Sequence, residues 1–360
     1  MKNNHIIHKK SINSFQKCLL TWFDQHGRKN LPWQKNKNPY QTWVSEVMLQ
    51  QTQVSTVIPY FLRFIDQFPS VTTLAQATED EVLHLWTGLG YYTRARNLHR
   101  SAKIIVEHYE GQFPNAYAEL EKLPGIGRST AGAILSIAFE KATPILDGNV
   151  KRVLTRWRGI TEWPGEKNTL ATLWDIAEQL TPSERCADYT QAIMDLGATI
   201  CTRKKPLCAQ CPLKFSCIAK SKGIENTIPL SKPKKTLPIR QTTLLIFKQN
   251  KKILLEKRPS IGVWGSLWSL PEIKGTPSFP EIEAICQERF QGSITKLESM
   301  PSFRHTFSHF HLEILPVIIS LKKMPCKIMA DAPRIWYNLL QPQILGLPAP
   351  IKSLLSQIET

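Results

Sequence analysis

Four cysteines stand close together in the second half of the chain. They follow the pattern C-x6-C-x2-C-x5-C and are Cys201, Cys208, Cys211 and Cys217. Thiolates at this spacing can close a compact loop around a metal. Zinc and an iron–sulfur cluster both accept four cysteines, so the ligand count leaves the two open. The other four cysteines are scattered along the chain and are interpreted as ordinary buried thiols: Cys18, Cys186, Cys286 and Cys326.

Two acidic residues suggest a second kind of chemistry. Glu46 lies in a predicted helix over about residues 41–50, opposite an apolar arc and next to a run without other charges. A carboxyl that faces an apolar pocket has a raised pKa and can donate a proton near neutral pH. The next charged residues after Asp147 are all basic (Lys151, Arg152, Arg156 and Arg158), which predicts a low pKa and an ionised carboxylate. The alternative for Glu46 is a solvated side chain on the surface of a helix.

A glycine-rich turn precedes Asp147 by one helix. Residues 123–127 read LPGIG, and the next helix begins at Arg128. The glycines Gly125 and Gly127 let backbone N–H groups approach a ligand, and the positive end of the helix dipole lies beside them. The turn is therefore a candidate phosphate-binding site, although a plain connection between two helices is the alternative.

The charge of the chain indicates a polyanionic partner. There are 46 Lys and Arg against 29 Asp and Glu, a formal net charge of +17. Such an excess favours nucleic acid, although it shows attraction and not chemistry. The N-terminus has no apolar segment typical of a signal peptide, and no apolar run is long enough to cross a membrane. We expect a cytoplasmic, DNA-associated protein that is neither secreted nor membrane-bound.

The elements that position these residues fall into three parts. Helical periodicity predicts a helical domain over residues 1–224, with the hairpin at 123–128 and the cysteine loop at 201–217. A Lys- and Pro-rich stretch over 225–240 is typical of a linker. Strands over 242–247 and 252–256 and a helix over 280–290 predict a smaller α+β domain over 241–360.

Taken together, these motifs resemble the helix-hairpin-helix DNA glycosylase superfamily. Its MutY-type adenine glycosylase branch is matched by the cysteine spacing and by three sequence segments: LPGIG, SEVMLQQTQV and FSH. The resemblance implies a mainly α helix-hairpin-helix domain with one [4Fe–4S] cluster held by the four cysteines. It also implies a smaller Nudix-like α+β domain at the C-terminal end, and it covers nearly the whole chain.

The resemblance also implies roles for the acidic residues. Glu46 matches the catalytic acid of the family, and Asp147 would stabilise a positively charged sugar, with Asn149 supporting the water or the sugar. Relatives such as endonuclease III, which also cut the strand, carry a lysine where this chain has Ser129. Since serine cannot form a Schiff base with the sugar, we expect hydrolysis without strand cleavage.

The resemblance also implies which residues of this chain contact DNA. Gln51 matches a residue that wedges into the DNA stack and Tyr91 one that stacks on a base, while the hairpin contributes Gly125, Gly127 and Ser129. The expected adenine pocket contains three residues: Trp33, Leu49 and Gln191. A core position remains the alternative for Trp33, and a satisfied core amide remains the alternative for Gln191.

The C-terminal part departs from the Nudix hydrolase signature. Three residues match positions of the signature: Gly275, Glu281 and Arg289. The carboxylates that would hold magnesium are replaced by Phe290, Ser293 and Ile294. We therefore expect a domain that reads a base and does not hydrolyse a nucleotide. The resemblance assigns recognition of 8-oxoguanine to three consecutive residues: Phe307, Ser308 and His309.

The combined prediction is an adenine DNA glycosylase that acts as a monomer. Its partner would be double-stranded DNA with an A:8-oxoG or A:G mispair, and its product an abasic site. Two alternatives remain: a non-enzymatic protein that binds damaged DNA, and a bifunctional glycosylase/lyase like endonuclease III.

Overall fold

The computed structural model describes residues 6–35, 37–232, 236–290, 293–321 and 333–359. The chain divides into two compact units, and each consists of two segments. The first unit contains Met1–Gln76 and Asn97–Lys234, and the second contains Ala77–Arg96 and Lys235–Thr360. The grouping of Ala77–Arg96 with the C-terminal segment was not expected from the sequence. The domain limits at 224 and 240 stay a prediction.

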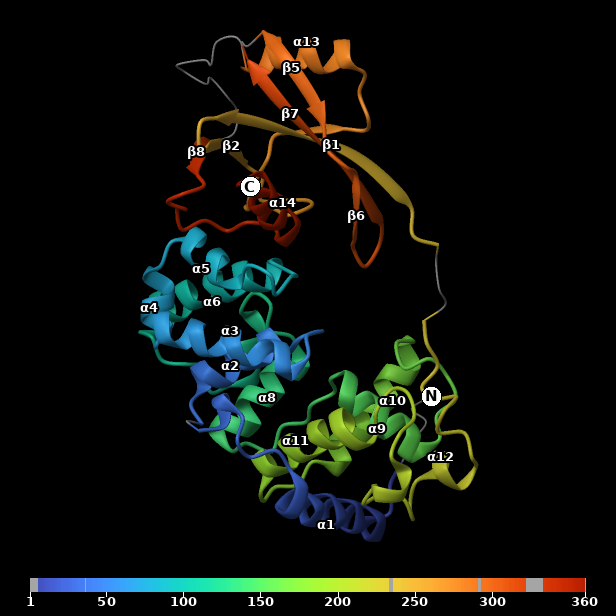
Figure 1. Ribbon diagram of the computed structural model, residues 1–360. Coiled ribbons are helices and arrows are strands. Elements are labelled where there is room, and N and C mark those ends of the chain that lie inside the picture. The colour runs from blue at the N-terminus through green and yellow to red at the C-terminus, as the bar shows by residue number, and fades with distance from the viewer. Residues whose placement is uncertain (1–5, 36, 233–235, 291–292, 322–332, 360) are drawn as a thin grey trace. The chain divides into compact units, whose positions relative to one another are not determined.

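The first unit is helical in its described part (Figure 1). Its elements are α1 (Lys9–His26), η1 (Pro32–Gln34), α2 (Pro39–Leu49), α3 (Val54–Gln67), α4 (Val71–Gln76), α6 (Thr93–Tyr109, which begins in the second unit), α7 (Tyr117–Lys122), α8 (Arg128–Phe139), α9 (Gly148–Arg158), α10 (Lys167–Leu180), α11 (Cys186–Asp195), the π-helical turn η2 (Leu196–Ile200), η3 (Cys208–Gln210) and α12 (Ile218–Ser221).

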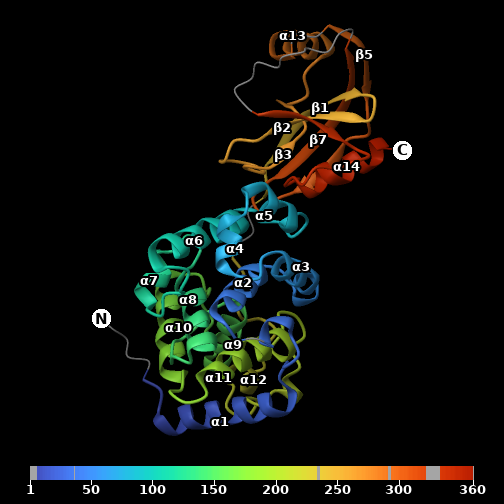
Figure 2. The same ribbon diagram turned by 90° about the vertical axis from the view of Figure 1, so that its left-hand side faces the viewer.

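Apolar faces of these helices form the core of the first unit. Helices α1 and α8 to α11 share a cluster in which the Phe15 ring meets the Trp157 ring edge-on, with centroids 4.8 Å apart. Figure 2 shows α1 running across the lower ends of α9 to α11. Helix α2 packs against α3 and α8 and buries Trp43, Val47 and Met48. Burial of each large apolar side chain contributes about 1.5 to 3 kcal/mol to the free energy of unfolding. It also fixes which side of α2 remains for polar residues.

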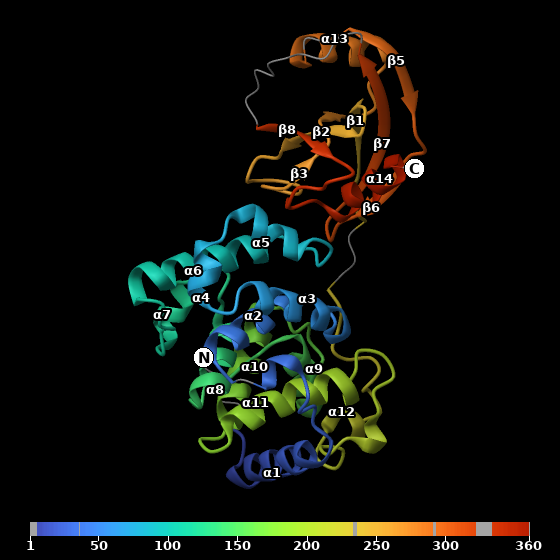
Figure 3. The same ribbon diagram turned by 60° about the vertical axis from the view of Figure 1, so that its left-hand side comes forward.

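The second unit contains a mixed sheet. Its strands are β1 (Ile239–Gln249), β2 (Lys252–Lys257), β3 (Trp268–Ser269), β4 (Glu272–Lys274), β5 (Ile294–Ser299), β6 (Phe303–Thr306), β7 (His311–Leu321) and β8 (Arg334–Asn338). The main path has the order β3-β2-β1-β7-β5, and β1 runs parallel to β7. Helices α13 (Phe279–Phe290) and α14 (Ala349–Glu359) lie on opposite sides of the sheet (Figure 3). This arrangement agrees with the predicted α+β class.

Helix α5 (Glu79–Trp86) also belongs to the second unit. The Thr78 hydroxyl accepts a hydrogen bond from the Glu81 N–H and the Glu81 carboxylate accepts one from the Thr78 N–H, a capping box that starts the helix. Asp80 forms an ion pair with Lys257 at 3.0 Å and accepts a hydrogen bond from Trp268 Nε1 at 3.1 Å. These bonds attach α5 to the β2 and β3 strands. In the described part of the chain, no helix combines the length and apolar character that a membrane crossing requires.

Candidate active site

Glu46 lies on helix α2, whose start is fixed by two local signals. Asn38 caps the helix by accepting a hydrogen bond from the Gln41 N–H at 2.8 Å, and Pro39 occupies the first helical position. Because the apolar residues of α2 are buried against α3 and α8, Glu46 faces the other way, as predicted.

A cavity of about 220 Å³ opens beside Glu46. Its lining residues come from helices α1, α2, α8 and α11 and from the segment between α1 and α2, which includes η1: Phe23, Arg28, Lys29, Trp33, Gln34, Lys37, Thr42, Ser45, Glu46, Ile137, Ala187, Asp188 and Gln191. Trp33 is buried, with its ring edge-on to Phe61, so it is both a core residue and part of the wall. Leu49 does not line the cavity, and its contact with a base stays a prediction.

The environment of Glu46 favours a protonated carboxyl. Burial, with a smaller contribution from the negative charge of Asp147, raises the pKa of Glu46 to about 8. Among the described residues, no cation forms an ion pair with this carboxyl. At neutral pH a group with that pKa is mostly protonated and can act as a general acid.

Asp147 is the N-cap residue of helix α9. Its Oδ1 accepts a hydrogen bond from the Val150 N–H at 2.7 Å, and its Oδ2 accepts one from Asn149 Nδ2 at 3.0 Å. The prediction of a low pKa was wrong. Burial raises the pKa of Asp147 above its usual value, although these hydrogen bonds and Arg152 act in the opposite direction.

Asn149 connects Asp147 with the cysteine loop. Its Oδ1 accepts a hydrogen bond from Arg152 Nη2 at 2.8 Å, and Arg152 Nε donates to the Cys201 carbonyl oxygen at 2.6 Å. Asp147, Asn149 and Cys201 are therefore joined by consecutive hydrogen bonds, which hold Asn149 in one orientation.

The hairpin has the geometry of a tight turn. Gly125 has φ +80°, and a methyl group there would lie 2.9 Å from the Asn97 Cβ atom. Gly127 is the N-cap of α8, and a methyl group at this position would have no neighbour within 4 Å. The backbone at the start of α8 is thus accessible to an anion. The Ser129 hydroxyl accepts a hydrogen bond from the Leu146 N–H at 3.0 Å, beside Asp147.

Two expected DNA contacts lie on strained backbone. Gln51 has φ +58° and is exposed, while Tyr91 has φ +49° and is 49% exposed. Positive φ is uncommon for residues other than glycine. Gln51 belongs to the first unit and Tyr91 to the second, and their contact with DNA stays a prediction.

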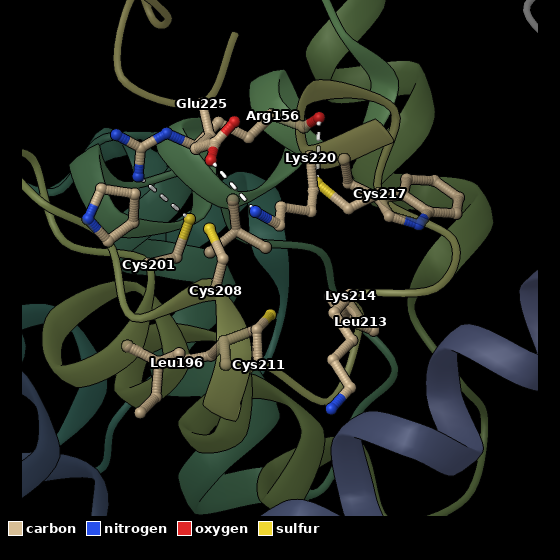
Figure 4. A pocket seen from close by; sticks show the side chains of 14 residues that line it. Arg156, Leu196, Cys201, Cys208, Cys211, Leu213, Lys214, Cys217, Lys220 and Glu225 are labelled. Carbon is tan, nitrogen blue, oxygen red and sulfur yellow. Dashed lines mark hydrogen bonds and ion pairs between the residues drawn. The ribbon is translucent and has the colours of Figure 1, made fainter. Parts of the chain in front are cut away.

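The four clustered cysteines line a second cavity, of about 20 Å³, which we call the cysteine pocket. Their side chains face one another around it (Figure 4). None of them forms a disulfide, and Arg156, which is 2% exposed, donates a hydrogen bond to the Cys201 Sγ at 3.3 Å. Of the four scattered cysteines, Cys18 is exposed, contrary to the prediction, and Cys326 lies outside the described residues.

The donor set of the cysteine pocket consists of four thiols. Within the described ranges, no group of three or more His, Cys, Asp or Glu side chains is arranged to hold one metal ion. Four thiols around one space, with Lys214 and Lys220 among the lining side chains, could hold either a single metal ion or an iron–sulfur cluster.

The expected reading loop is the turn between β6 and β7. Ser308 and His309 are exposed at its tip, and the Phe307 N–H donates to the Phe310 carbonyl oxygen at 2.9 Å. The Phe307 and Phe310 rings are stacked, with centroids 4.6 Å apart. The buried Phe310 ring holds the turn against the sheet and leaves its tip accessible.

Two of the residues that match the Nudix signature, Glu281 and Arg289, form hydrogen bonds or ion pairs within the second unit. Glu281 accepts hydrogen bonds from the Ser278 backbone and hydroxyl, and Arg289 pairs with Glu256 at 3.2 Å. Glu256 pairs in addition with Arg334 at 3.0 Å. This carboxylate is neutralised by two arginines.

Comparison with known proteins follows the same division of the chain. The family model described as "HhH-GPD superfamily base excision DNA repair protein" matches residues 44–179, and the NUDIX domain model matches residues 242–357. The adenine DNA glycosylase of Buchnera aphidicola subsp. Acyrthosiphon pisum is 43% identical over 345 residues, which are 96% of this chain and 97% of the relative. The chain belongs to the adenine DNA glycosylase family. The predicted family and fold class are therefore confirmed.

More distant members of the family support the assignment. The human adenine DNA glycosylase is 37% identical over 360 residues, covering 84% of this chain and 66% of the human protein. Among solved structures, a thermostable thymine-DNA glycosylase superposes with a TM-score of 0.54 at 27% identity, over 59% of this chain and 98% of that one.

Several residues that build the site in this family member were not found from its sequence. A methyl group at Gly132 would lie 2.3 Å from the Pro144 carbonyl oxygen, so this glycine lets the segment before Asp147 pass close to α8. A glycine inside a helix is the signal that indicates such an approach. Arg28 and the buried Asp195 form an ion pair at 2.6 Å, which no local pattern indicates.

Proposed function

We propose that this DNA repair glycosylase removes adenine that is paired with 8-oxoguanine or guanine. The observation that carries the proposal is Glu46, a carboxyl that lines a cavity and whose pKa is raised to about 8 by burial and by the negative charge of a second carboxyl, Asp147. A base inside a duplex is out of reach, so the nucleotide must rotate into the cavity before reaction. The names of the relatives support adenine as the base.

In the proposed mechanism, the two carboxyl groups act in different protonation states. The neutral Glu46 carboxyl donates its proton to adenine N7, which turns the base into a leaving group. As the glycosidic bond breaks, the sugar gains oxocarbenium character, and the Asp147 carboxylate stabilises this positive charge. Asn149, held by Arg152, orients the sugar or the attacking water.

The reaction stops at the abasic site. Ser129 occupies the position where a lysine would attack the sugar, and its hydroxyl is engaged with the Leu146 N–H. Lys151 follows Asp147 by four residues and allows only slow trapping of the opened sugar.

The cysteine pocket supports a [4Fe–4S] cluster as cofactor. Cys201, Cys208, Cys211 and Cys217 would hold it, and the cluster would supply a structural crosslink for the loop. Arg156 donates to the Cys201 sulfur and keeps the loop in place. Iron and acid-labile sulfide in the purified protein, and their loss in Cys211→Ser, would support this assignment over zinc.

Double-stranded DNA is the proposed partner, bound by a monomer. The hairpin glycines would grip a phosphate, Gln51 and Tyr91 would fill the space left by the rotated adenine, and the Phe307–His309 tip would read 8-oxoguanine. The damaged base differs from guanine by an N7 hydrogen and a C8 oxygen, so the Ser308 hydroxyl can distinguish the two.

The test is a single-turnover incubation with a labelled duplex that contains adenine opposite 8-oxoguanine, with and without hot alkali. Strand cleavage only after alkali supports base removal without lyase activity. Cleavage without alkali would favour the bifunctional glycosylase/lyase. Tight binding with intact DNA in both samples would favour the damage-binding protein and overturn the proposal.

A further inference from the structure

A buried carboxylate lies behind Arg28 and Gln191, two residues that line the cavity beside Glu46. Asp195, at the C-terminal end of α11, is 0% exposed. Its Oδ1 accepts hydrogen bonds from Arg28 Nε at 2.9 Å and Nη2 at 2.6 Å, and from Gln191 Nε2 at 2.9 Å. Its Oδ2 accepts one from the Arg28 backbone N–H at 2.8 Å. Both oxygen atoms of Asp195 are thus occupied by donors.

These bonds fix the orientation of the Gln191 amide. A carboxylate paired with arginine can only accept hydrogen bonds, so the neighbouring amide must turn its nitrogen toward it. The opposite orientation would place two acceptors against each other in a buried site, which is unfavourable. The Gln191 carbonyl oxygen is therefore the part of the amide that is left for a ligand of the cavity that Gln191 lines.

On the basis of the proposed function, we propose that Asp195 is a positioning residue for base selection. Held by Arg28, it fixes the Gln191 amide so that the carbonyl oxygen accepts a hydrogen bond from the 6-amino group of adenine. Adenine carries a donor at this position, whereas hypoxanthine and guanine carry a carbonyl oxygen. An acceptor in the site meets the amino group but repels the carbonyl group, which selects adenine.

The experiment compares three bases placed opposite 8-oxoguanine: adenine, purine, which lacks the 6-amino group, and hypoxanthine. Single-turnover excision rates are measured for the unaltered full-length protein and for Gln191→Met, Asp195→Asn and the double variant. Differences in the intrinsic reactivity of the bases cancel when the ratio of two rates is compared between proteins.

We expect Gln191→Met to lower the ratio of the adenine rate to the purine rate by about five- to tenfold, since one hydrogen bond is lost. Asp195→Asn should lower the ratio by a similar factor and raise the ratio of hypoxanthine to purine, because the amide can turn over. The double variant should match Gln191→Met, since methionine has no amide to orient.

A purely structural role for Asp195 gives a different result. Asp195→Asn would then lower the excision rates of all three bases by the same factor, or the double variant would show the effects of both single variants multiplied together. Either outcome would overturn the inference. If Asp195→Asn does not fold, Arg28→Met provides a second route. Without Arg28 the Asp195 carboxylate loses two of the side-chain hydrogen bonds that fix its position, so it holds the Gln191 amide less firmly and a change of the ratios in the same direction is expected.

Failure of the proposed function would look different again. If the unaltered protein excises none of the three bases, the glycosylase proposal fails. If it excises adenine but the variants leave the ratios unchanged, only the role of Asp195 fails.

Discussion

Glu46 in the first unit and Glu256 in the second are both partly buried carboxyl groups, but their surroundings are opposite. Glu256 pairs with Arg289 at 3.2 Å and Arg334 at 3.0 Å. Glu46 has no ion pair among the described residues, and the neighbouring charge is the negative one of Asp147. A carboxyl that is neutralised by cations contributes to folding, whereas one without a cation keeps a proton that can be transferred. The comparison favours the first unit as the location of the proposed chemistry.

The largest expected effect that tests this comparison is on turnover. Glu46→Gln removes the proton donor but keeps the shape of the side chain, so we expect the single-turnover rate to fall by about 10² to 10⁴. Binding of the mispaired duplex should change little, since the amide fills the same volume. The matched control is Glu256→Gln, which should leave the rate nearly unchanged. Equal rates for Glu46→Gln and the unaltered protein would remove the mechanism.

The raised pKa of Glu46 also predicts how stability depends on pH. Between the ordinary value of 4.5 and about 8, the folded protein binds more protons than the unfolded chain, so this group makes stability fall as pH rises through that window. Glu46→Gln removes the effect. We expect it to raise the free energy of unfolding by roughly 2 to 4 kcal/mol at pH 8.5 and very little at pH 5. Denaturant titration of both proteins at the two pH values measures this, and an equal gain at both would contradict the assigned pKa.

The paired carboxylate should behave in the opposite way. Glu256→Gln leaves Arg334, whose side chain is 6% exposed, without its anion. We expect a loss of about 1 to 3 kcal/mol in the free energy of unfolding at neutral pH. Thermal unfolding of the full-length protein measures the loss. A stabilised Glu256→Gln variant would show that the comparison between the two carboxyl groups does not hold.

The smallest effect concerns Thr42, one turn before Glu46. Its hydroxyl is buried and has no hydrogen-bond partner in the described part of the chain. Thr42→Val keeps the shape and removes the unsatisfied group, so we expect a gain of about 1 kcal/mol in the free energy of unfolding. Ser45→Ala is the control, because that hydroxyl donates to the Thr42 carbonyl oxygen at 2.8 Å and its removal should destabilise the protein. A destabilised Thr42→Val protein would mean that the hydroxyl has a partner, such as a bound water.

The sequence was sufficient where the pattern is local. The charge-free run after Glu46 predicted the orientation of this residue and its raised pKa, and the LPGIG turn predicted the start of α8. The sequence did not predict the pKa of Asp147 correctly, because basic residues that are close to Asp147 in the sequence were assumed to be close to its carboxylate in space. Arg156, one of the basic residues that follow Asp147, donates to the Cys201 sulfur instead, and burial outweighs the remaining positive charge. The pair of Arg28 and Asp195 joins residues 167 positions apart, which no pattern of a single chain can indicate.

The bonds of α5 to strands β2 and β3 affect how the chain can be divided. Because each unit is made of two segments, the polypeptide passes from one unit to the other at residues 76/77, 96/97 and 234/235. A single proteolytic cut or stop codon therefore cannot yield either unit complete and alone. A fragment ending near residue 224 would contain Asp80 without Lys257 and Trp268, leaving a buried face of α5 open to water. Expression of separate halves should thus begin from a design that supplies residues 77–96 with their strands.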